Sequence, residues 1–167
     1  LKDLAGKTVY LTGKGTTPEY VMNYLLGAAG IADSVTLEFK SEATEVVSVL
    51  ASDPTAVGVL PQPFATAALV KNQALSAPID LTEAWNEVSE QTGNDSQLAT
   101  GVTVVRNEFL DKHPEAVEEF LKGQSASVEY VNEHPDKAAK LVVEQGILES
   151  EAVAQKAIPA CHLVCLT

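Results

Sequence analysis

The spacing of hydrophobic positions changes several times along the first half of the chain. Short apolar or alternating runs at 7–11, 34–39 and 56–60 predict three strands. The helical period appears between them, first over 18–29 and again after Ser41, which we expect to cap the second helix. Strands separated by helices predict a mainly parallel sheet with helices on its faces, which is an α/β fold.

The helix predicted over 18–29 has recognisable ends. Thr16 followed by Glu19 is a capping-box pattern, and Gly30 is a typical helix stop. We expect its apolar face to pack on the sheet, and that face consists of Val21, Met22, Leu25, Leu26 and Ala29.

The middle of the chain mixes further elements of both kinds. Residues 64–70 have the pattern of a helix, and 76–80 can add a strand. Asp80 and Glu83 mark the start of another helix, and 100–105 again has the pattern of a strand.

Beyond Asn107 the pattern is helical. Pro114 and Pro135 each stand in a first helical turn, with a histidine before them and an acid after them. Gly146 fits the end of the second helix. The apolar stripes are Val117, Phe120, Leu121, Val128 and Val131 on the first helix and Ala138, Leu141 and Val142 on the second. We expect a packed helical pair, because a repeat array needs three or more units.

The net charge and the chain ends narrow the classes of function. A formal charge of −12 in 167 residues argues against nucleic acid and against an anionic membrane surface, because both require clustered Lys and Arg. No apolar run approaches a membrane span, and no signal segment opens the sequence. The chain starts at Leu1 and ends in an apolar run, so we expect a processed or truncated piece of a longer protein.

The strongest chemical candidate is the glycine-bearing loop between the first strand and the first helix. At such a position, backbone N–H groups converge beyond the carboxyl end of a sheet and can hold a small polar or anionic ligand. Lys14 lies between the two glycines, which does not fit a nucleotide P-loop, and Pro18 breaks the dinucleotide pattern. A capped turn without a ligand and a small-ligand site both stay open.

No catalytic or metal-binding constellation emerges from the sequence. His113 and His134 precede prolines at helix starts, where capping and exposure explain them. Cys161, His162 and Cys165 offer at most three metal ligands at a spacing unlike known zinc sites, so we expect an apolar segment there. We therefore predict no catalytic residues, no metal and no cofactor.

Four segments in order resemble a known family. Residues 1–9, 14–17, 58–64 and 103–117 are similar to the substrate-binding components of ABC importers. The specific group is the nitrate/sulfonate/taurine and pyrimidine-precursor group, which has the type II periplasmic-binding-protein fold. The resemblance implies that 1–105 forms the second α/β lobe with its return crossover strand. It also implies that 106–167 forms helices packing at the hinge or against a first lobe, which would precede Leu1.

The resemblance also implies which residues face a ligand and what the protein does. The ligand-facing positions lie in the loops after the first three strands: Thr12, Gly13, Lys14, Gly15, Thr16 and Thr17, then Ser41, Glu42 and Thr44, then Pro61, Gln62 and Pro63. The implied protein is not an enzyme. It captures a small polar solute between two lobes and delivers it to the permease subunits of the membrane.

Further expectations follow from the same resemblance. The implied location is extracytoplasmic, either periplasmic or as a lipoprotein on the cell surface. A chain lacking one lobe would expose apolar surface, so we expect it to self-associate. Two alternatives share the fold: the effector domain of a transcriptional regulator, and a pyrimidine- or thiamine-precursor enzyme. For such an enzyme, Lys14 is the one reactive candidate in the loop.

Overall fold

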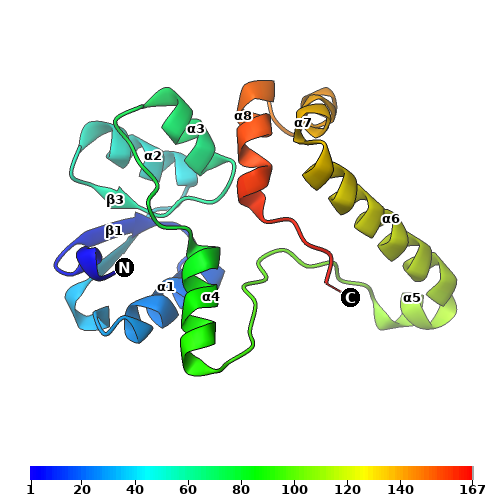
Figure 1. The fold of residues 1–167 in the computed structure, drawn as a ribbon, viewed down its shortest axis with the longest axis horizontal. Helices are drawn as coiled ribbons and strands as arrows, with labels where there is room; N and C mark the ends of the chain where they lie inside the picture. Colours follow the sequence, from blue (N-terminus) through cyan, green and yellow to red (C-terminus); the bar gives the residue numbers. More distant parts are fainter. Residues whose placement is uncertain (167) are drawn as a thin grey trace. The chain divides into compact units, whose positions relative to one another are not determined.

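The computed structural model describes residues 1–166. The chain divides into two compact units, one over Leu1–Thr100 and a second that begins at Gly101. Figure 1 labels the α-helices of both units and the strands β1 and β3 of the first.

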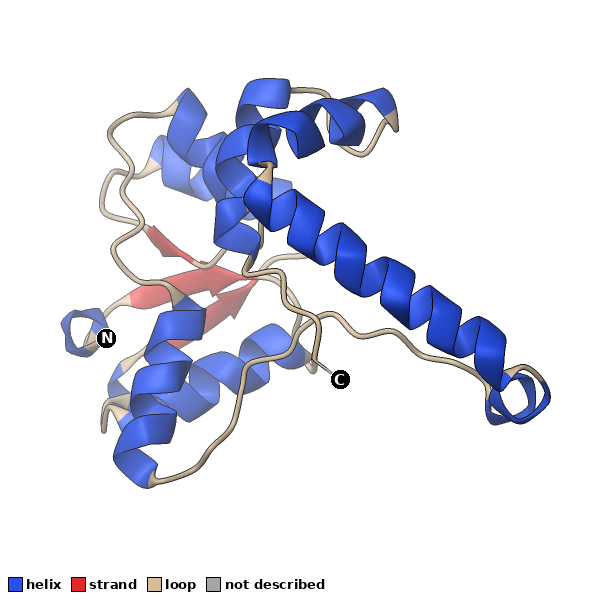
Figure 2. Ribbon diagram, turned by 45° about the vertical axis from the view of Figure 1, so that its right-hand side comes forward, coloured by secondary structure: helices blue, strands red, loops and turns tan. Residues whose placement is uncertain are grey.

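The first unit is built on the parallel sheet that the sequence predicts. Its strands are β1 (Thr8–Leu11), β2 (Thr36–Phe39) and β3 (Val57–Gly58), in the order β2-β1-β3 with both pairings parallel. Helices lie on both sides of this sheet in Figure 2. The strands are shorter than the runs that predicted them, but each one lies within its predicted segment.

Helices of the first unit connect these strands and cover the sheet. They are η1 (Lys2–Leu4), α1 (Thr17–Ala28), η2 (Ala32–Ser34), α2 (Ala43–Ser52), α3 (Phe64–Lys71) and α4 (Leu81–Thr92). Val9 and Leu11 of β1 pack with Met22 and Leu26 of α1 on one face of the sheet. Gly58 of β3 faces α2 on the other. The two crossover helices therefore cover opposite faces.

The buried face of α1 is the one that the sequence predicts. Val21, Met22, Leu25 and Leu26 are all buried, and the predicted fifth member, Ala29, is partly buried just beyond the helix. The face contacts two different neighbours. Met22 and Leu26 join the cluster on the sheet, whereas Val21 and Leu25 join a cluster with Ala84 and Val88 of α4. The 3.6-residue period thus lets one helix take part in two clusters, one on the sheet and one with α4.

Two predicted helix caps are wrong in detail. The Thr16 side chain donates to the carbonyl oxygen of Gly13 and makes no cap bond, and the Glu19 carboxylate accepts from the amide of Gly15 instead of Thr16. Ser41 lies outside α2, whose N-cap residue is Glu42. At Thr16 the loop carbonyl of Gly13 takes the hydroxyl that the capping pattern assigns to the helix, whereas α2 starts one residue later than the pattern places it. The Asp80 cap is confirmed, since its carboxylate accepts from the amides of Thr82 and Glu83.

Two predicted strands do not form. Residues 76–80 and 100–105 are irregular, so the return crossover strand expected at the latter is absent from the described chain. Val102 and Val104 are 76% and 85% exposed. A β-branched run becomes a strand only where another strand offers it hydrogen-bond partners, and no such pairing forms with the described strands.

The second unit is helical. It comprises α5 (Asn107–Lys112), α6 (Pro114–Glu133), α7 (Pro135–Glu144), α8 (Glu151–Ala157) and η3 (Pro159–Cys161). Both predicted His-Pro helix starts are confirmed. The core joins α7 to α8 through Ala138, Ala139, Ala154 and Ile158. In the part of the chain that the structure describes, α6 buries no side chain, and its predicted stripe is half exposed, with Phe120 57% accessible.

The two C-terminal cysteines do not share an α-helix. Cys161 ends η3 and is exposed, whereas Cys165 follows in irregular chain and is partly buried. Both are free thiols. Among residues 1–166, no helix is both long and apolar enough to cross a bilayer.

Gly58 gives a stability prediction for the contact between β3 and α2. A Cβ there would lie 2.9 Å from Cγ1 of Val46 and 3.1 Å from Cδ1 of Leu50, and Val46 is fully buried. Gly58→Ala should therefore lower the free energy of unfolding by about 1–3 kcal/mol through overpacking. Urea denaturation followed by circular dichroism measures it.

A matched Gly→Ala change in the same unit serves as the control. Gly27 lies in α1, and a Cβ there meets nothing within 4 Å. Gly27→Ala should raise the free energy of unfolding by about 0.5–1 kcal/mol, because alanine loses less backbone entropy in a helix. A Gly58→Ala protein as stable as the wild type would contradict the tight contact.

Candidate ligand-binding loops at the carboxyl edge of the sheet

The loops that follow the three strands leave the same edge of the sheet. Leu11 and Phe39 are register partners at the ends of β1 and β2. Just beyond, the amide of Lys40 donates to the carbonyl oxygen of Leu11 at 2.7 Å, and the amide of Val59 donates to that of Tyr10 at 2.8 Å. The ladder therefore continues to the start of each loop, and parallel strands bring the loops together at their carboxyl ends.

The first loop is held in shape by its own hydrogen bonds. Gly13 and Gly15 adopt φ values of +82° and +76°, a region that favours glycine. The Thr16 hydroxyl and amide both donate to the carbonyl oxygen of Gly13, at 2.7 and 3.0 Å. The Glu19 carboxylate accepts from the Gly15 amide, and the Tyr20 hydroxyl donates to the Gly15 carbonyl oxygen at 3.2 Å. Side chains from the first turn of α1 thus hold the backbone of the loop in place.

At the start of the second loop, the Lys40 ammonium group forms an ion pair with Glu38. Nζ of Lys40 lies 2.7 Å from a Glu38 carboxylate oxygen and 5.3 Å from the centre of the Tyr10 ring. The hydrogen bond to Glu38 raises the pKa of Lys40 above its ordinary value. In the same loop, the Glu45 carboxylate accepts from the Ser41 amide at 2.9 Å.

The third loop turns through Gln62 and Pro63, which are joined by a cis peptide bond. The side-chain oxygen of Gln62 accepts from the Thr66 hydroxyl at 2.8 Å and from the Thr66 amide at 3.3 Å. Thr66 is 7% exposed, so the Gln62 side chain is fixed against the first turn of α3. Its amide group is therefore held on the loop in one orientation.

The predicted ligand residues belong to these three loops or to the helical turns directly after them. Most are exposed, and Thr12, Gly13, Gln62 and Pro63 are partly buried. The parallel sheet places the three loops at one edge. The contact of any of these residues with a ligand stays a prediction. Sequence reasoning did not single out Lys40 or Glu45. The spacing in the sequence was the available signal for Glu45. Glu45 stands four residues after Ser41, as Glu19 stands four residues after Gly15, and each carboxylate accepts from the backbone amide at that distance.

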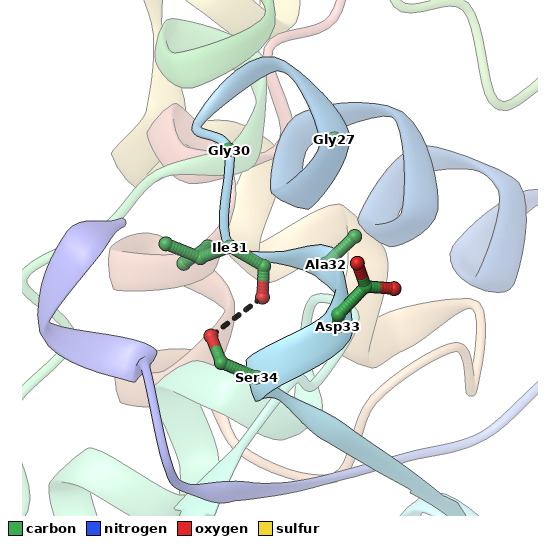
Figure 3. Close-up of a pocket in the computed structure, with 6 residues that line it drawn as sticks. All are labelled: Gly27, Gly30, Ile31, Ala32, Asp33 and Ser34. Carbon is green, nitrogen blue, oxygen red and sulfur yellow. Dashed lines mark hydrogen bonds between the residues drawn. The ribbon is translucent and has the colours of Figure 1, made fainter.

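Two surface hollows lie outside these loops. One, of about 360 Å³, is lined by Gly27 and residues 30–34 at the end of α1, and Figure 3 shows the Ser34 hydroxyl bonded to the Ile31 carbonyl oxygen. It adjoins the start of β2 and hence the amino edge of the sheet. The other, of about 480 Å³, is lined by residues at the end of α4 and in the segment after it. Within residues 1–166, no group of three or more His, Cys, Asp or Glu side chains is placed to hold a metal.

Comparison with known proteins decides the family. The family model described as NMT1/THI5 like matches residues 1–138. The chain belongs to the NMT1/THI5-like family. No curated relative matches the sequence of this NMT1/THI5-like chain.

A solved structure extends the match over nearly the whole NMT1/THI5-like chain. The crystal structure of an ABC transporter from Parabacteroides distasonis aligns with 26% sequence identity and a TM-score of 0.75. The alignment covers 96% of this chain and 54% of that chain, so this chain spans about half the length of the matched protein. The predicted fold class, an α/β periplasmic-binding-protein lobe with a mainly parallel sheet and helical flanks, is confirmed.

Proposed function

We propose that this chain is part of the solute-binding component of an ABC transporter. The observation that carries the proposal is the combination of the family match with a structural match that covers 96% of this chain and 54% of an ABC transporter chain. The three loops at the carboxyl edge of the sheet are the natural contact surface, because open α/β sheets bind ligands there.

The proposed solute is small and polar. Backbone amides, the hydroxyls of Thr16 and Thr17 and the amide of Gln62 recognise it by hydrogen bonds. Glu19 and Glu45 already accept from the amides of Gly15 and Ser41, so a ligand that needs these donors competes with the protein's own carboxylates. The Thr16 hydroxyl also donates to the Gly13 carbonyl oxygen and the Gln62 side-chain oxygen accepts from Thr66, whereas the Thr17 hydroxyl takes no part in these bonds.

We propose that the protein acts outside the cytoplasm. In our proposal, a second lobe closes on the solute and the closed form docks on the permease, so that binding shifts a hinge equilibrium. Anchoring as a lipoprotein would keep the protein near that permease. We propose binding without turnover, because the loops assemble no nucleophile with an adjacent base, and Lys14 is exposed at their rim.

The Thr17 hydroxyl offers a direct test of the loop. Thr17 is exposed at the first turn of α1 and takes no part in the hydrogen bonds that hold the loop. We would identify the small molecule that co-purifies with the full-length protein by native mass spectrometry, and titrate it back by calorimetry. Thr17→Val, which removes only the hydroxyl, should weaken binding about fivefold to tenfold.

Thr36→Val is the matched control for Thr17→Val. Thr36 is exposed at the amino end of β2, so Thr36→Val makes the same change at the opposite edge of the sheet and should leave the affinity unchanged. Equal affinity of the Thr17→Val and wild-type proteins would remove this loop from the site. Chemical conversion of the molecule, abolished by Lys14→Ala, would replace binding with catalysis.

A further inference from the structure

The segment that leads out of the first unit is tied back to α4 by side chains. α4 ends at Gly93, which adopts a left-handed conformation, and the Asn94 amide then donates to the carbonyl oxygen of Ser89 at 3.0 Å. These bonds reverse the chain direction. Ser96 therefore returns to the side of the helix that carries Trp85 and Ser89.

Ser96 is held by two residues one helical turn apart. Nε1 of Trp85 donates to the Ser96 hydroxyl oxygen at 3.1 Å. The Ser89 hydroxyl lies 2.8 Å from that oxygen and 3.1 Å from the Ser96 carbonyl oxygen. One arrangement uses every proton once: Trp85 donates to the Ser96 hydroxyl, this hydroxyl donates to Ser89, and Ser89 donates to the Ser96 carbonyl oxygen.

This network is fixed to the core of the first unit. Ser89 is 5% exposed, and a buried hydroxyl is tolerated only where it is hydrogen-bonded. The Trp85 ring lies 4.5 Å from that of Tyr24 on α1, centre to centre. Leu98 packs on the same cluster as Trp85, which includes Leu25. Ser96 and Leu98 are thus both attached, one by polar and one by apolar contacts.

Immediately beyond, the chain is exposed and irregular. Residues 99–106 are all exposed and form no helix or strand, and the boundary between the two units falls at Thr100. The chain therefore changes within a few residues of Ser96, from a segment held on the first unit by Ser96 and Leu98 to an exposed segment.

We propose that Trp85, Ser89 and Ser96 form a clasp that fixes where the connector between the two units becomes free. The clasp makes residues 94–98 part of the first unit and confines large backbone rotations to the exposed residues that follow. In a protein whose units move relative to one another, the point at which the connector leaves the first unit sets which backbone dihedral angles change during the movement. The inference concerns the connector alone and does not depend on the proposed ligand.

Amide hydrogen exchange, measured by NMR, tests the clasp. In Ser96→Ala, the amides of Asn94 and Ser96 should exchange about tenfold faster than in the wild type, because local opening no longer breaks the side-chain bonds. The sheet amides of Lys40 and Val59 should keep their wild-type rates, since they report opening of the whole unit. Trp85→Phe removes the indole N–H together with part of the ring that packs on Tyr24, so it should also accelerate exchange at the same two amides.

A matched serine separates the clasp from a general effect of losing a hydroxyl. The Ser48 hydroxyl donates to the carbonyl oxygen of Thr44 within α2, so Ser48→Ala should leave the amides of Asn94 and Ser96 unchanged. Wild-type exchange at these amides in Ser96→Ala would overturn the proposal. An equal acceleration at Lys40 and Val59 would also overturn it, because the network would then stabilise the whole unit and not residues 94–98 in particular.

Discussion

Replacing Leu25 with alanine is expected to lower the free energy of unfolding of the first unit by about 2–5 kcal/mol. Leu25 is fully buried and packs between α1 and α4 with Val21, Ala84 and Val88. The substitution removes apolar contacts and leaves a cavity that the two helices can close only in part. Urea denaturation measures the loss, with Trp85, the single tryptophan of the chain, as the fluorescent probe in the same cluster.

An exposed apolar residue of the same unit is the control. Val70 lies in α3 and is 41% exposed, so Val70→Ala should change the free energy of unfolding by about 0.5 kcal/mol or less. If Leu25→Ala cost no more than Val70→Ala, the contact between α1 and α4 would contribute little to stability. The layered core described above would then be wrong.

Gly13→Ala is expected to give the second large effect, at the candidate ligand loop. Gly13 adopts a φ of +82°, and a Cβ there would lie 2.6 Å from Oγ1 of Thr16 and 3.0 Å from Cγ of Pro18. Left-handed backbone costs an alanine about 1–2 kcal/mol. Relieving the clash requires Thr16 to move, which costs its bond to the Gly13 carbonyl oxygen, worth about 1 kcal/mol more.

Gly15 provides a control within the same loop. It has a φ of +76°, but a Cβ there meets nothing within 4 Å. Gly15→Ala should therefore show the left-handed cost alone, and the difference between the two variants isolates the contact with Thr16. Thermal unfolding of both proteins measures that difference, and calorimetric titration shows whether the displaced Thr16 also weakens ligand binding. Equal stabilities would mean that the loop accommodates a Cβ at Gly13 without strain.

Features that depend on neighbours in sequence could be predicted well. The buried face of α1, the Asp80 cap and the two helices that follow His113 and His134 form as expected. In each case the determining groups lie within a few residues of one another, so the pattern itself contains the physical cause.

Features that depend on partners distant in sequence, or on competing local partners, could not be predicted. The run at 100–105 has strand-forming residues but no strand beside it, and it remains irregular. Thr16 has a capping side chain, but its hydroxyl donates to the Gly13 carbonyl oxygen, and Ser41 lies one residue before the N-cap position of α2, which Glu42 occupies. The bond between Trp85 and Ser96 joins residues eleven positions apart across a helix end, and no periodic pattern encodes it.

The sequence by itself therefore determined the α/β class, the alternation of β1, α1, β2, α2 and β3 and the composition of the loops after these strands, because these follow from hydrophobic period and local backbone preference. The parallel sheet brings the three loops to one edge, as the alternation of strands and helices predicts, but only the tertiary structure decided that the protein's own carboxylates occupy some of their amides. It alone also decided that the connector begins at a clasp on α4. Such arrangements depend on which distant groups meet in space, and hydrogen-bond partners are chosen there by distance and burial.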